Sequence, residues 1–318
     1  MTDRTPPGRK GPRRRSAQPP AQRQRRSDPA RESAYLLLRA VSAQDAYANL
    51  ELPRLLRAAG LRGRDAAFAT ELAYGTLRMQ GLYDAVAEQA AARPTTSIDA
   101  PVLDVIRLGI HQLLGMRVPD HAAVSATVAL ARQHVGQGAA GFVNAVLRRV
   151  VERDRDAWVE AVTADAPDEL SRLAVVHSHP AWIVRALRAS LLANTGAEEE
   201  LEDLLAAQNV PGALSLAARP GLVDDEELLD AGARRSPTAR TAWTLPAGDP
   251  GDLAAVREGR AAVQDAGSQV LTLALADAPI EGSDDRWLDL CAGPGGKAGL
   301  LAALAHERGA ELRANEIS

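Results

Sequence analysis

The sequence has 318 residues, enough for two domains or three small ones with ordinary buried cores. Hydrophobic residues make up 46% of it, yet no apolar run approaches the roughly 18 residues of a membrane span, and no apolar stretch follows the basic first residues. A membrane helix and a secretory signal are therefore not expected, and the single cysteine excludes an internal disulfide.

Residues 1–27 are predicted to form a disordered basic tail, because they are rich in Pro, Gln and Arg and contain almost nothing to bury. They carry a charge of +8, whereas the remaining residues sum to −12. A basic arm on an acidic body suits a polyanionic partner, since it acts through phosphate contacts and counterion release. A merely solubilising extension is the alternative. With one cysteine and no targeting segment, the protein is expected to be cytoplasmic.

Residues 28–153 are predicted to be entirely helical. Ser27 resembles an N-cap, and Asp28-Pro29 suits a first helical turn. Apolar residues then recur at helical spacing, including one long stretch from Phe68 to Val86. The predicted breaks between helices lie at Gly60, Pro94, Pro119 and Gly136.

Residues 154–262 are predicted to be a helical linker followed by a small α+β subdomain. Its strands are expected at 214–216 and 241–244, around a short acidic helix at 224–229. Residues 261–318 then alternate, with strands expected at 261–264, 286–291 and 311–316 and helices between them. This order predicts the start of a parallel, doubly wound sheet.

A glycine-rich turn follows the strand at 286–291, in the sequence WLDLCAGPGGK at 287–297. Glycines let a backbone approach a ligand closely, and the N-terminus of the next helix offers free N–H groups to an anionic group. About twenty residues further on, Glu316 ends the next strand, where a carboxylate can accept both hydroxyls of a ribose. The segment therefore predicts a nucleotide-like ligand.

Three kinds of ligand commonly bind to a glycine-rich turn between a strand and a helix. A phosphate-binding P-loop is excluded, because it needs glycine at Cys291 and a hydroxyl at Ala298. A dinucleotide fits, since Gly293, Gly295 and Ala298 satisfy G-x-G-x-x-[GA]. S-adenosylmethionine fits as well, with its carboxylate near the turn and its ribose on Glu316. The spacing alone leaves these last two open.

The string LDLCAGPGGK at 288–297 resembles the cofactor motif DLCAAPGGK of the RNA 5-methylcytosine methyltransferases, with Gly293 in place of the second alanine. ANEIS at 314–318 resembles that family's ribose-binding strand end, and VQDAGSQ at 263–269 its V-Q-D-x-S-[SA]-Q segment. ELAYGTLR at 71–78, RLGIHQLL at 107–114, PDHAAV at 119–124 and GFVNAVLR at 141–148 follow in the expected order. Together they resemble the bacterial small-subunit ribosomal RNA (cytosine-5) methyltransferase B family, in which a NusB-like domain is fused to a methyltransferase.

The resemblance implies an all-α NusB-like RNA-binding domain at 28–153, the small α+β subdomain within 154–262, and the N-terminal part of a Rossmann-like methyltransferase domain at 263–318. It implies S-adenosylmethionine as the cofactor, ribosomal RNA as the partner, a monomer without a metal, and methylation of cytosine carbon 5. The NusB-like part also suggests regulation of transcription. The cofactor-binding residues that it implies are Cys291, Ala292, Gly293, Pro294, Gly295, Gly296, Lys297 and Glu316.

Two departures from the family pattern matter. A strand like T-L-R-V-N is replaced by Leu214–Arg219, which puts its RNA contacts in doubt. The family's catalytic cysteines lie in later D-A-P-C and T-C-S motifs, which these residues lack, so we expect a C-terminally truncated, inactive chain with no catalytic residue. The alternatives are an RNA-binding or antitermination-type module with a non-catalytic methyltransferase remnant and a nicotinamide-dependent oxidoreductase.

Several other residues have a plainer interpretation. Cys291 belongs to the cofactor motif and is not expected to be a nucleophile. His177 and His179 lack a third ligand and predict a turn before Pro180, not a zinc site. His111 is expected to pack inside its helical segment. Arg78 and Arg148-Arg149 form either an RNA-facing patch or a solvated helix face.

Overall fold

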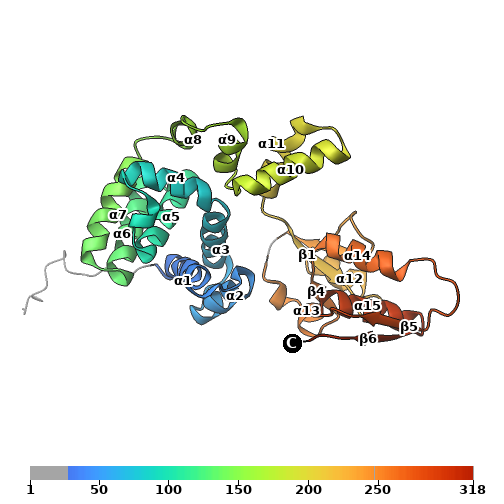
Figure 1. Ribbon diagram of the computed structural model, residues 1–318. Helices are drawn as coiled ribbons and strands as arrows, with labels where there is room; N and C mark the ends of the chain where they lie inside the picture. The colour runs from blue at the N-terminus through green and yellow to red at the C-terminus, as the bar shows by residue number, and fades with distance from the viewer. Residues whose placement is uncertain (1–27, 247, 318) are drawn as a thin grey trace, which may run out of the picture. The chain divides into compact units, whose positions relative to one another are not determined.

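The computed structural model describes residues 28–246 and 248–317, so the predicted basic tail at 1–27 lies outside the described residues. The chain divides into two compact units after Asn209. We call the described residues 28–209 the helical unit and residues 210–317 the mixed unit (Figure 1). Within the described ranges, no helix is both long and apolar enough to cross a membrane.

The helical unit confirms the all-helical prediction for its first part. Its helices in chain order are α1 (Pro29–Gln44), α2 (Ala48–Ala58), α3 (Gly63–Arg78), α4 (Gln80–Ala91), α5 (Ala100–Leu114), α6 (Asp120–His134), α7 (Gln137–Val150), α8 (Arg155–Thr163), α9 (Glu169–Val176), α10 (Ala181–Asn194) and α11 (Leu201–Gln208). Short 3-10 turns lie at Thr95–Ser97 and Glu198–Glu200.

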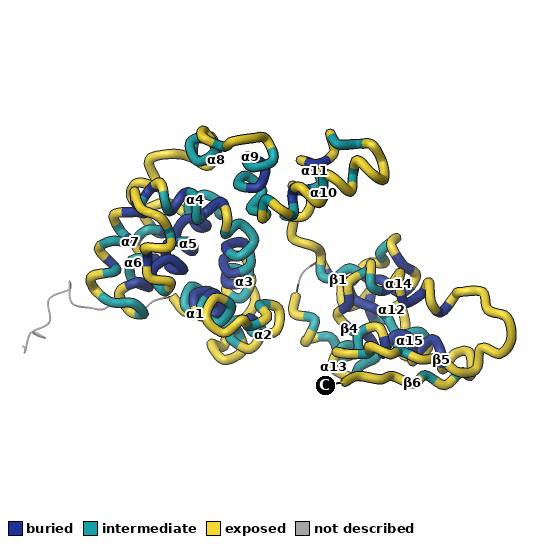
Figure 2. The backbone as a smooth tube through the Cα atoms, viewed as in Figure 1, coloured by how far each residue is buried: buried dark blue, intermediate teal, exposed yellow. Residues whose placement is uncertain are grey.

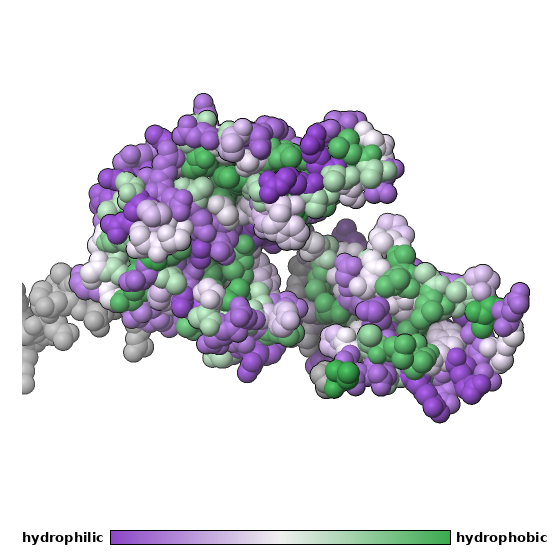
Figure 3. Space-filling model, viewed as in Figure 1, coloured by the Kyte–Doolittle hydropathy of each residue, from purple (hydrophilic) through white to green (hydrophobic). Residues whose placement is uncertain are grey.

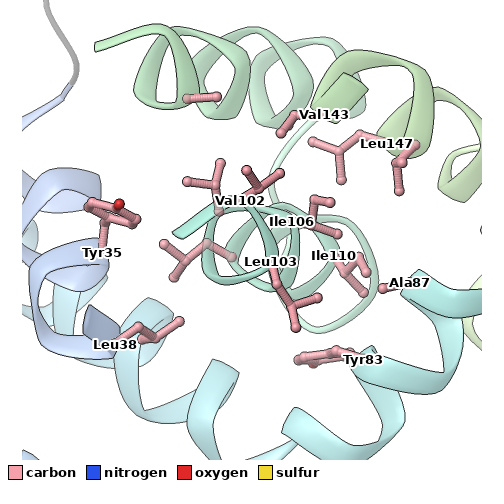
Figure 4. Packing of buried hydrophobic residues seen from close by; sticks show 14 of the residues in the cluster. Tyr35, Leu38, Tyr83, Ala87, Val102, Leu103, Ile106, Ile110, Val143 and Leu147 are labelled. Atoms are coloured by element: carbon pink, nitrogen blue, oxygen red, sulfur yellow. The ribbon is translucent and has the colours of Figure 1, made fainter. Parts of the chain in front are cut away.

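Helix α5 lies in the middle of the main core, and the tube in Figure 2 is dark along it. Ten of its fifteen residues are buried, including Val105, Ile106 and Ile110. Side chains from α1, α4 and α7 converge on α5, with Leu38, Tyr83 and Leu147 among those drawn in Figure 4. A mostly apolar helix surrounded by amphipathic ones removes most of its surface from water, which makes α5 the centre of this unit.

Two local predictions in the helical unit were wrong. The N-cap of α1 is Asp28, whose Oδ1 accepts from the Ala30 N–H at 2.9 Å, and not Ser27. The long stretch from Phe68 to Val86 is broken at Met79 into α3 and α4. Apolar periodicity continues across this break, because both helices bury side chains in the same core.

The last helices of this unit, α9 to α11, have their own small core of Leu173, Ala174, Val184, Leu201 and Leu205. The loop between α9 and α10 is held by one local contact and by one contact with α4. His179 Nδ1 lies 2.7 Å from the His177 carbonyl oxygen, and Ser178 Oγ accepts from the Gly81 N–H at 2.6 Å. The histidine pair thus shapes a turn, as predicted, and the described residues contain no cluster that could hold a metal.

The mixed unit contains two sheets. Strands β1 (Leu214–Ala218), β2 (Arg234–Arg235), β3 (Ala242–Leu245) and β4 (Ala261–Val263) form an antiparallel sheet in the order β2-β3-β1-β4, and β5 (Arg286–Asp289) pairs in parallel with β6 (Glu311–Ala314). The helices are α12 (Asp225–Asp230), α13 (Ala254–Arg257), α14 (Ala266–Ala276) and α15 (Gly296–Glu307), with a 3-10 turn at Pro250–Asp252. The strands expected at 214–216 and 241–244 and the acidic helix expected at 224–229 correspond to β1, β3 and α12, whereas β2 was not expected.

The partner of β4 differs from the prediction. Instead of beginning a parallel sheet, β4 pairs antiparallel with β1, with Leu216 opposite Val263. The Gln264 N–H continues this pairing by donating to the Ser215 carbonyl at 3.1 Å. Alternation of strands and helices does not specify which strands pair, so only β5 and β6 form the parallel pair.

Helices α14 and α15 pack together over a small core that includes Leu273, Leu300 and Leu304. The strand β5 alternates, so that Trp287 and Asp289 are partly buried while Leu288 and Leu290 are more than half exposed. Leu271 and Leu275 of α14 are similarly exposed. Figure 3 shows apolar surface gathered on the visible face of this unit. A two-stranded parallel sheet is thus covered on one side only.

Candidate functional site

Strands β5 and β6 end side by side, which brings the two sequence-predicted parts of the site together. Asp289 lies opposite Ala314 in the parallel pair. Beyond the strands, the Asn315 N–H donates to the Asp289 carbonyl at 2.8 Å, and the Ala292 N–H donates to the Asn315 carbonyl at 3.0 Å. The glycine turn and Glu316 are therefore neighbours at the carboxyl ends of two parallel strands, where ligands bind in open α/β sheets.

The turn from Cys291 to Gly296 closes on itself and begins α15. The Gly295 N–H donates to the Ala292 carbonyl at 2.7 Å, and Gly295 has φ of +103°, a conformation that favours glycine. Nothing lies within 4 Å of a Cβ built at Gly295 or Gly296. Cys291, Pro294 and Lys297 are exposed around the turn. The backbone at the start of α15 is consequently accessible to a ligand.

Glu316 reaches back to the turn. Its Oε2 accepts from the Gly293 N–H at 2.6 Å, and its Oε1 accepts from the Ile317 N–H at 2.8 Å. A Cβ at Gly293 would overlap this carboxylate and would lie 2.8 Å from its Cδ. The glycine that replaces the usual alanine of the motif therefore makes room for Glu316 beside the turn.

Asp289 is a residue of the site that the sequence analysis did not select. Its Oδ1 accepts from the Cys291 N–H at 3.2 Å, whereas Oδ2 is buried and has no hydrogen-bond partner among the described residues. A buried carboxylate oxygen without a partner is costly unless a ligand or water satisfies it. The position of Asp289, two residues before Cys291 and at the end of an apolar strand, could have identified it as a site residue from the sequence.

Arg219 connects the small antiparallel sheet to the helix that follows the turn. It comes directly after β1, and its Nη1 donates to the Gly259 carbonyl. Its guanidinium lies against Gly299 in α15, where a Cβ would be 3.0 Å from Cζ. This arginine, in the segment that departs from the family strand, is therefore occupied in holding α15.

His111, considered in the sequence analysis, does not belong to this site. His111 is buried in the helical unit, where its Nδ1 lies 2.8 Å from the Tyr83 hydroxyl. Its Nε2 lies 3.6 Å from Glu71 Oε1, and the interaction with His111 lowers the pKa of the Glu71 carboxyl despite partial burial. These contacts agree with the packing role expected for His111.

Comparison with known proteins gives one family match and several relatives. Residues 28–152 match the NusB family. Rv1407 of Mycobacterium tuberculosis is named as a methyltransferase, without a stated substrate. It is 51% identical to this chain over 300 residues, which cover 93% of this chain and 65% of that protein. Ribosomal RNA small subunit methyltransferase B of Pseudomonas putida is 31% identical, over 91% of this chain and 64% of its own length. Ribosomal RNA small subunit methyltransferase B of Pseudomonas syringae is 32% identical to this chain. The match covers 84% of this chain and 57% of that protein.

Among solved structures, the crystal structure of PH0851 has a TM-score of 0.68 at 17% identity, over 92% of this chain and 64% of that one. At this identity the likeness concerns the fold alone. The chain spans less than two thirds of the length of each of these relatives.

Proposed function

We propose that the chain, as a member of the ribosomal RNA small subunit methyltransferase B family, provides the RNA-binding and cofactor-binding parts of an S-adenosylmethionine-dependent ribosomal RNA methyltransferase. The observation that carries the proposal is the joining of the glycine turn to Glu316 by the 2.6 Å hydrogen bond from the Gly293 N–H. The NusB-family match over residues 28–152 supports the RNA-binding part.

The residues of the turn fit S-adenosylmethionine. The backbone N–H group of Gly296, the first residue of α15, suits the carboxylate of its methionine part. The Glu316 carboxylate suits the two ribose hydroxyls, once it exchanges its bond to the Gly293 N–H for them. The unpartnered Asp289 Oδ2 suits a further donor on the ligand. Bound there, the cofactor supplies an electrophilic methyl group.

We assign the transfer to carbon 5 of a cytosine, following the resemblance of the turn to the RNA 5-methylcytosine methyltransferases. That chemistry requires a thiolate that adds to carbon 6 of the base. Cys291 is the only cysteine in the sequence, and its N–H is tied to Asp289 within the cofactor turn. The proposal therefore gives Cys291 a place beneath the cofactor and leaves the nucleophile to motifs that these 318 residues lack.

Ligand-dependent thermal unfolding tests the cofactor assignment. S-adenosylmethionine or S-adenosylhomocysteine at about 100 times Kd should stabilise the mixed unit by about 2.7 kcal/mol, and NAD should not. Glu316→Ala should abolish the shift, whereas Glu311→Ala, an exposed carboxylate on β6, should preserve it. Stabilisation by NAD alone would replace the methyltransferase proposal with the oxidoreductase alternative.

A methyl-transfer assay tests the nucleophile assignment. The 318-residue chain, incubated with labelled S-adenosylmethionine and unmodified ribosomal RNA, should transfer no methyl group, although it binds the cofactor. Transfer that disappears in Cys291→Ala but persists in the control Glu311→Ala would show that Cys291 is the nucleophile.

A further inference from the structure

We propose that Arg93, Arg149 and Arg153 of the helical unit form a surface that binds the phosphates of an RNA backbone; we call these three residues the arginine patch. The choice of RNA as partner rests on the function proposed above. The location and the chemistry of the surface rest on the contacts of the three side chains themselves.

Each arginine of the patch is held by a neighbour that leaves part of its guanidinium available. The Arg93 Cζ lies 4.7 Å from the ring centroid of Phe142, and the Arg153 Cζ lies 5.1 Å from that of Trp158. Arg149 Nη1 donates to the Ala90 carbonyl at 2.9 Å. A guanidinium stacked on a ring keeps its N–H groups at the edge free for acceptors, and its restricted motion reduces the entropy lost on binding.

The three positions belong to one surface. Phe142 and Arg149 are seven residues apart on α7, so they lie on the same helix face about 10 Å apart along the axis. Arg149 contacts the end of α4 at Ala90, three residues before Arg93. A surface pocket of about 200 Å³ continues from there, lined by Gln89, Ala90, Arg149, Glu152, Arg153 and Trp158.

The charge of the patch is not neutralised by neighbouring carboxylates. No ion pair within 4.0 Å involves any of the three arginines in the described part of the chain, whereas Arg107 is paired with Asp84 and Asp104. Glu152 is the one acidic residue in the lining of the pocket.

Two further carboxylates near the patch in sequence already have partners. Glu88 Oε1 accepts from the N–H and the hydroxyl of Thr95 at 2.8 and 2.9 Å. Asp154 Oδ1 accepts from the Ala157 N–H at 2.9 Å, as the N-cap of α8. Unpaired guanidiniums on a shared surface match phosphate groups, which they can bind through two parallel hydrogen bonds.

RNA affinity measured over a range of salt concentrations tests the patch. The full chain carrying Arg93→Gln, Arg149→Gln and Arg153→Gln is compared with wild type, using a labelled single-stranded oligoribonucleotide of mixed sequence. Loss of three phosphate contacts should make the slope of the logarithm of the association constant against the logarithm of the salt concentration less steep by about 2. At about 0.1 M salt, this corresponds to about a hundredfold weaker binding. The matched control carries Arg57→Gln, Arg62→Gln and Arg64→Gln, which are exposed and unpaired in the described structure, and should bind nearly as wild type.

A single variant that is expected to strengthen RNA binding distinguishes an effect on the patch from a folding defect. Glu152→Gln removes the carboxylate from the pocket lining and should strengthen RNA binding several-fold, with an unchanged Tm. Equal weakening by the patch and control triples, or no effect of Glu152→Gln, would overturn the patch while leaving cofactor binding untouched. Absence of RNA binding by the wild-type chain would overturn both the patch and the RNA substrate proposed above.

Discussion

The helical unit and the mixed unit are stabilised in different ways. The helical unit has one extensive apolar core around α5, to which seven other helices contribute buried side chains. The mixed unit instead has two small apolar cores, and several of its leucines remain exposed on α14 and β5. A large core buries enough apolar surface to stabilise a unit alone, whereas small cores leave stability dependent on polar contacts and bound groups. This difference is consistent with the proposal of a stable RNA-binding part joined to a ligand-responsive part.

The polar centre of the mixed unit is Gln269 of α14, which is fully buried. Its Oε1 accepts from the Thr241 hydroxyl at 2.8 Å, and its Nε2 donates to the carbonyls of Gln264 and Leu216 at 3.0 and 3.3 Å. One side chain therefore ties α14 to three segments of the antiparallel sheet. The helical unit has a comparable link at α5, where the buried Gln112 accepts from Arg31 of α1 at 2.7 Å and donates to the Thr127 hydroxyl of α6 at 3.0 Å.

Truncation of Ile106 should give the largest effect. Ile106 is fully buried in α5, so Ile106→Ala should lower the free energy of unfolding of the helical unit by about 2–5 kcal/mol. The matched change in the mixed unit is Leu300→Ala in α15. Hydrogen exchange measured peptide by peptide should show each change confined to its own unit. Loss of protection in both units from either variant would contradict two separately stabilised units.

Removal of the Gln269 amide should come next. Gln269→Met keeps the volume but leaves the Thr241 hydroxyl without its acceptor, which should cost about 1–3 kcal/mol in the mixed unit. Thr241→Val combined with Gln269→Met should cost less than the sum of the single variants, because the unpaired hydroxyl is then gone. Denaturant unfolding followed by the fluorescence of Trp243 and Trp287 measures this, in a background where Trp158 and Trp182 are replaced by Phe. Strict additivity would show that the hydrogen bond contributes nothing.

A pair of glycines tests how tightly the helical core is packed. A methyl group at Gly75 would overlap the His111 ring and lie 2.9 Å from Glu71 Oε1, so Gly75→Ala should destabilise the helical unit by about 1–3 kcal/mol. At Gly141, in α7, nothing lies within 4 Å of the new Cβ, and Gly141→Ala should stabilise by up to about 1 kcal/mol. Thermal unfolding followed by far-UV circular dichroism gives both values. The same sign for both would mean that helix propensity outweighs packing here.

Acid should affect the helical unit through Glu71, with the smallest expected effect. The pKa of the Glu71 carboxyl is lowered, mainly by the interaction with His111. The ionised carboxylate therefore stabilises the folded state above the unfolded-state pKa of about 4.3, and this stabilisation is lost as the pH falls through the folded-state pKa. Glu71→Gln should therefore be less stable than wild type at neutral pH and nearly equal to it in strong acid. Urea midpoints across this range provide the measurement, and a constant difference at every pH would exclude the linkage.

Much of the fold could be predicted from residues close together in the chain. The helices of the first part of the chain, strands β1, β3 and β4 and the glycine turn were expected at nearly their observed positions, because helix periodicity and turn chemistry are local properties. The break at Met79 was missed, since the apolar pattern continues through it. The pairing of Cys291–Lys297 with Glu316 was expected only through a strand–helix–strand order and the family resemblance.

The sequence by itself determined where helices, strands and the turn form, since backbone hydrogen bonds within a helix and the conformation of Gly295 depend on neighbouring residues. Tertiary structure alone decided that β4 pairs with β1, that Glu316 bonds to the Gly293 N–H, and that Arg93 stacks on Phe142 of α7. Such contacts join residues far apart in the chain. Their free energy depends on which surfaces the whole fold brings together, and no local pattern encodes that choice.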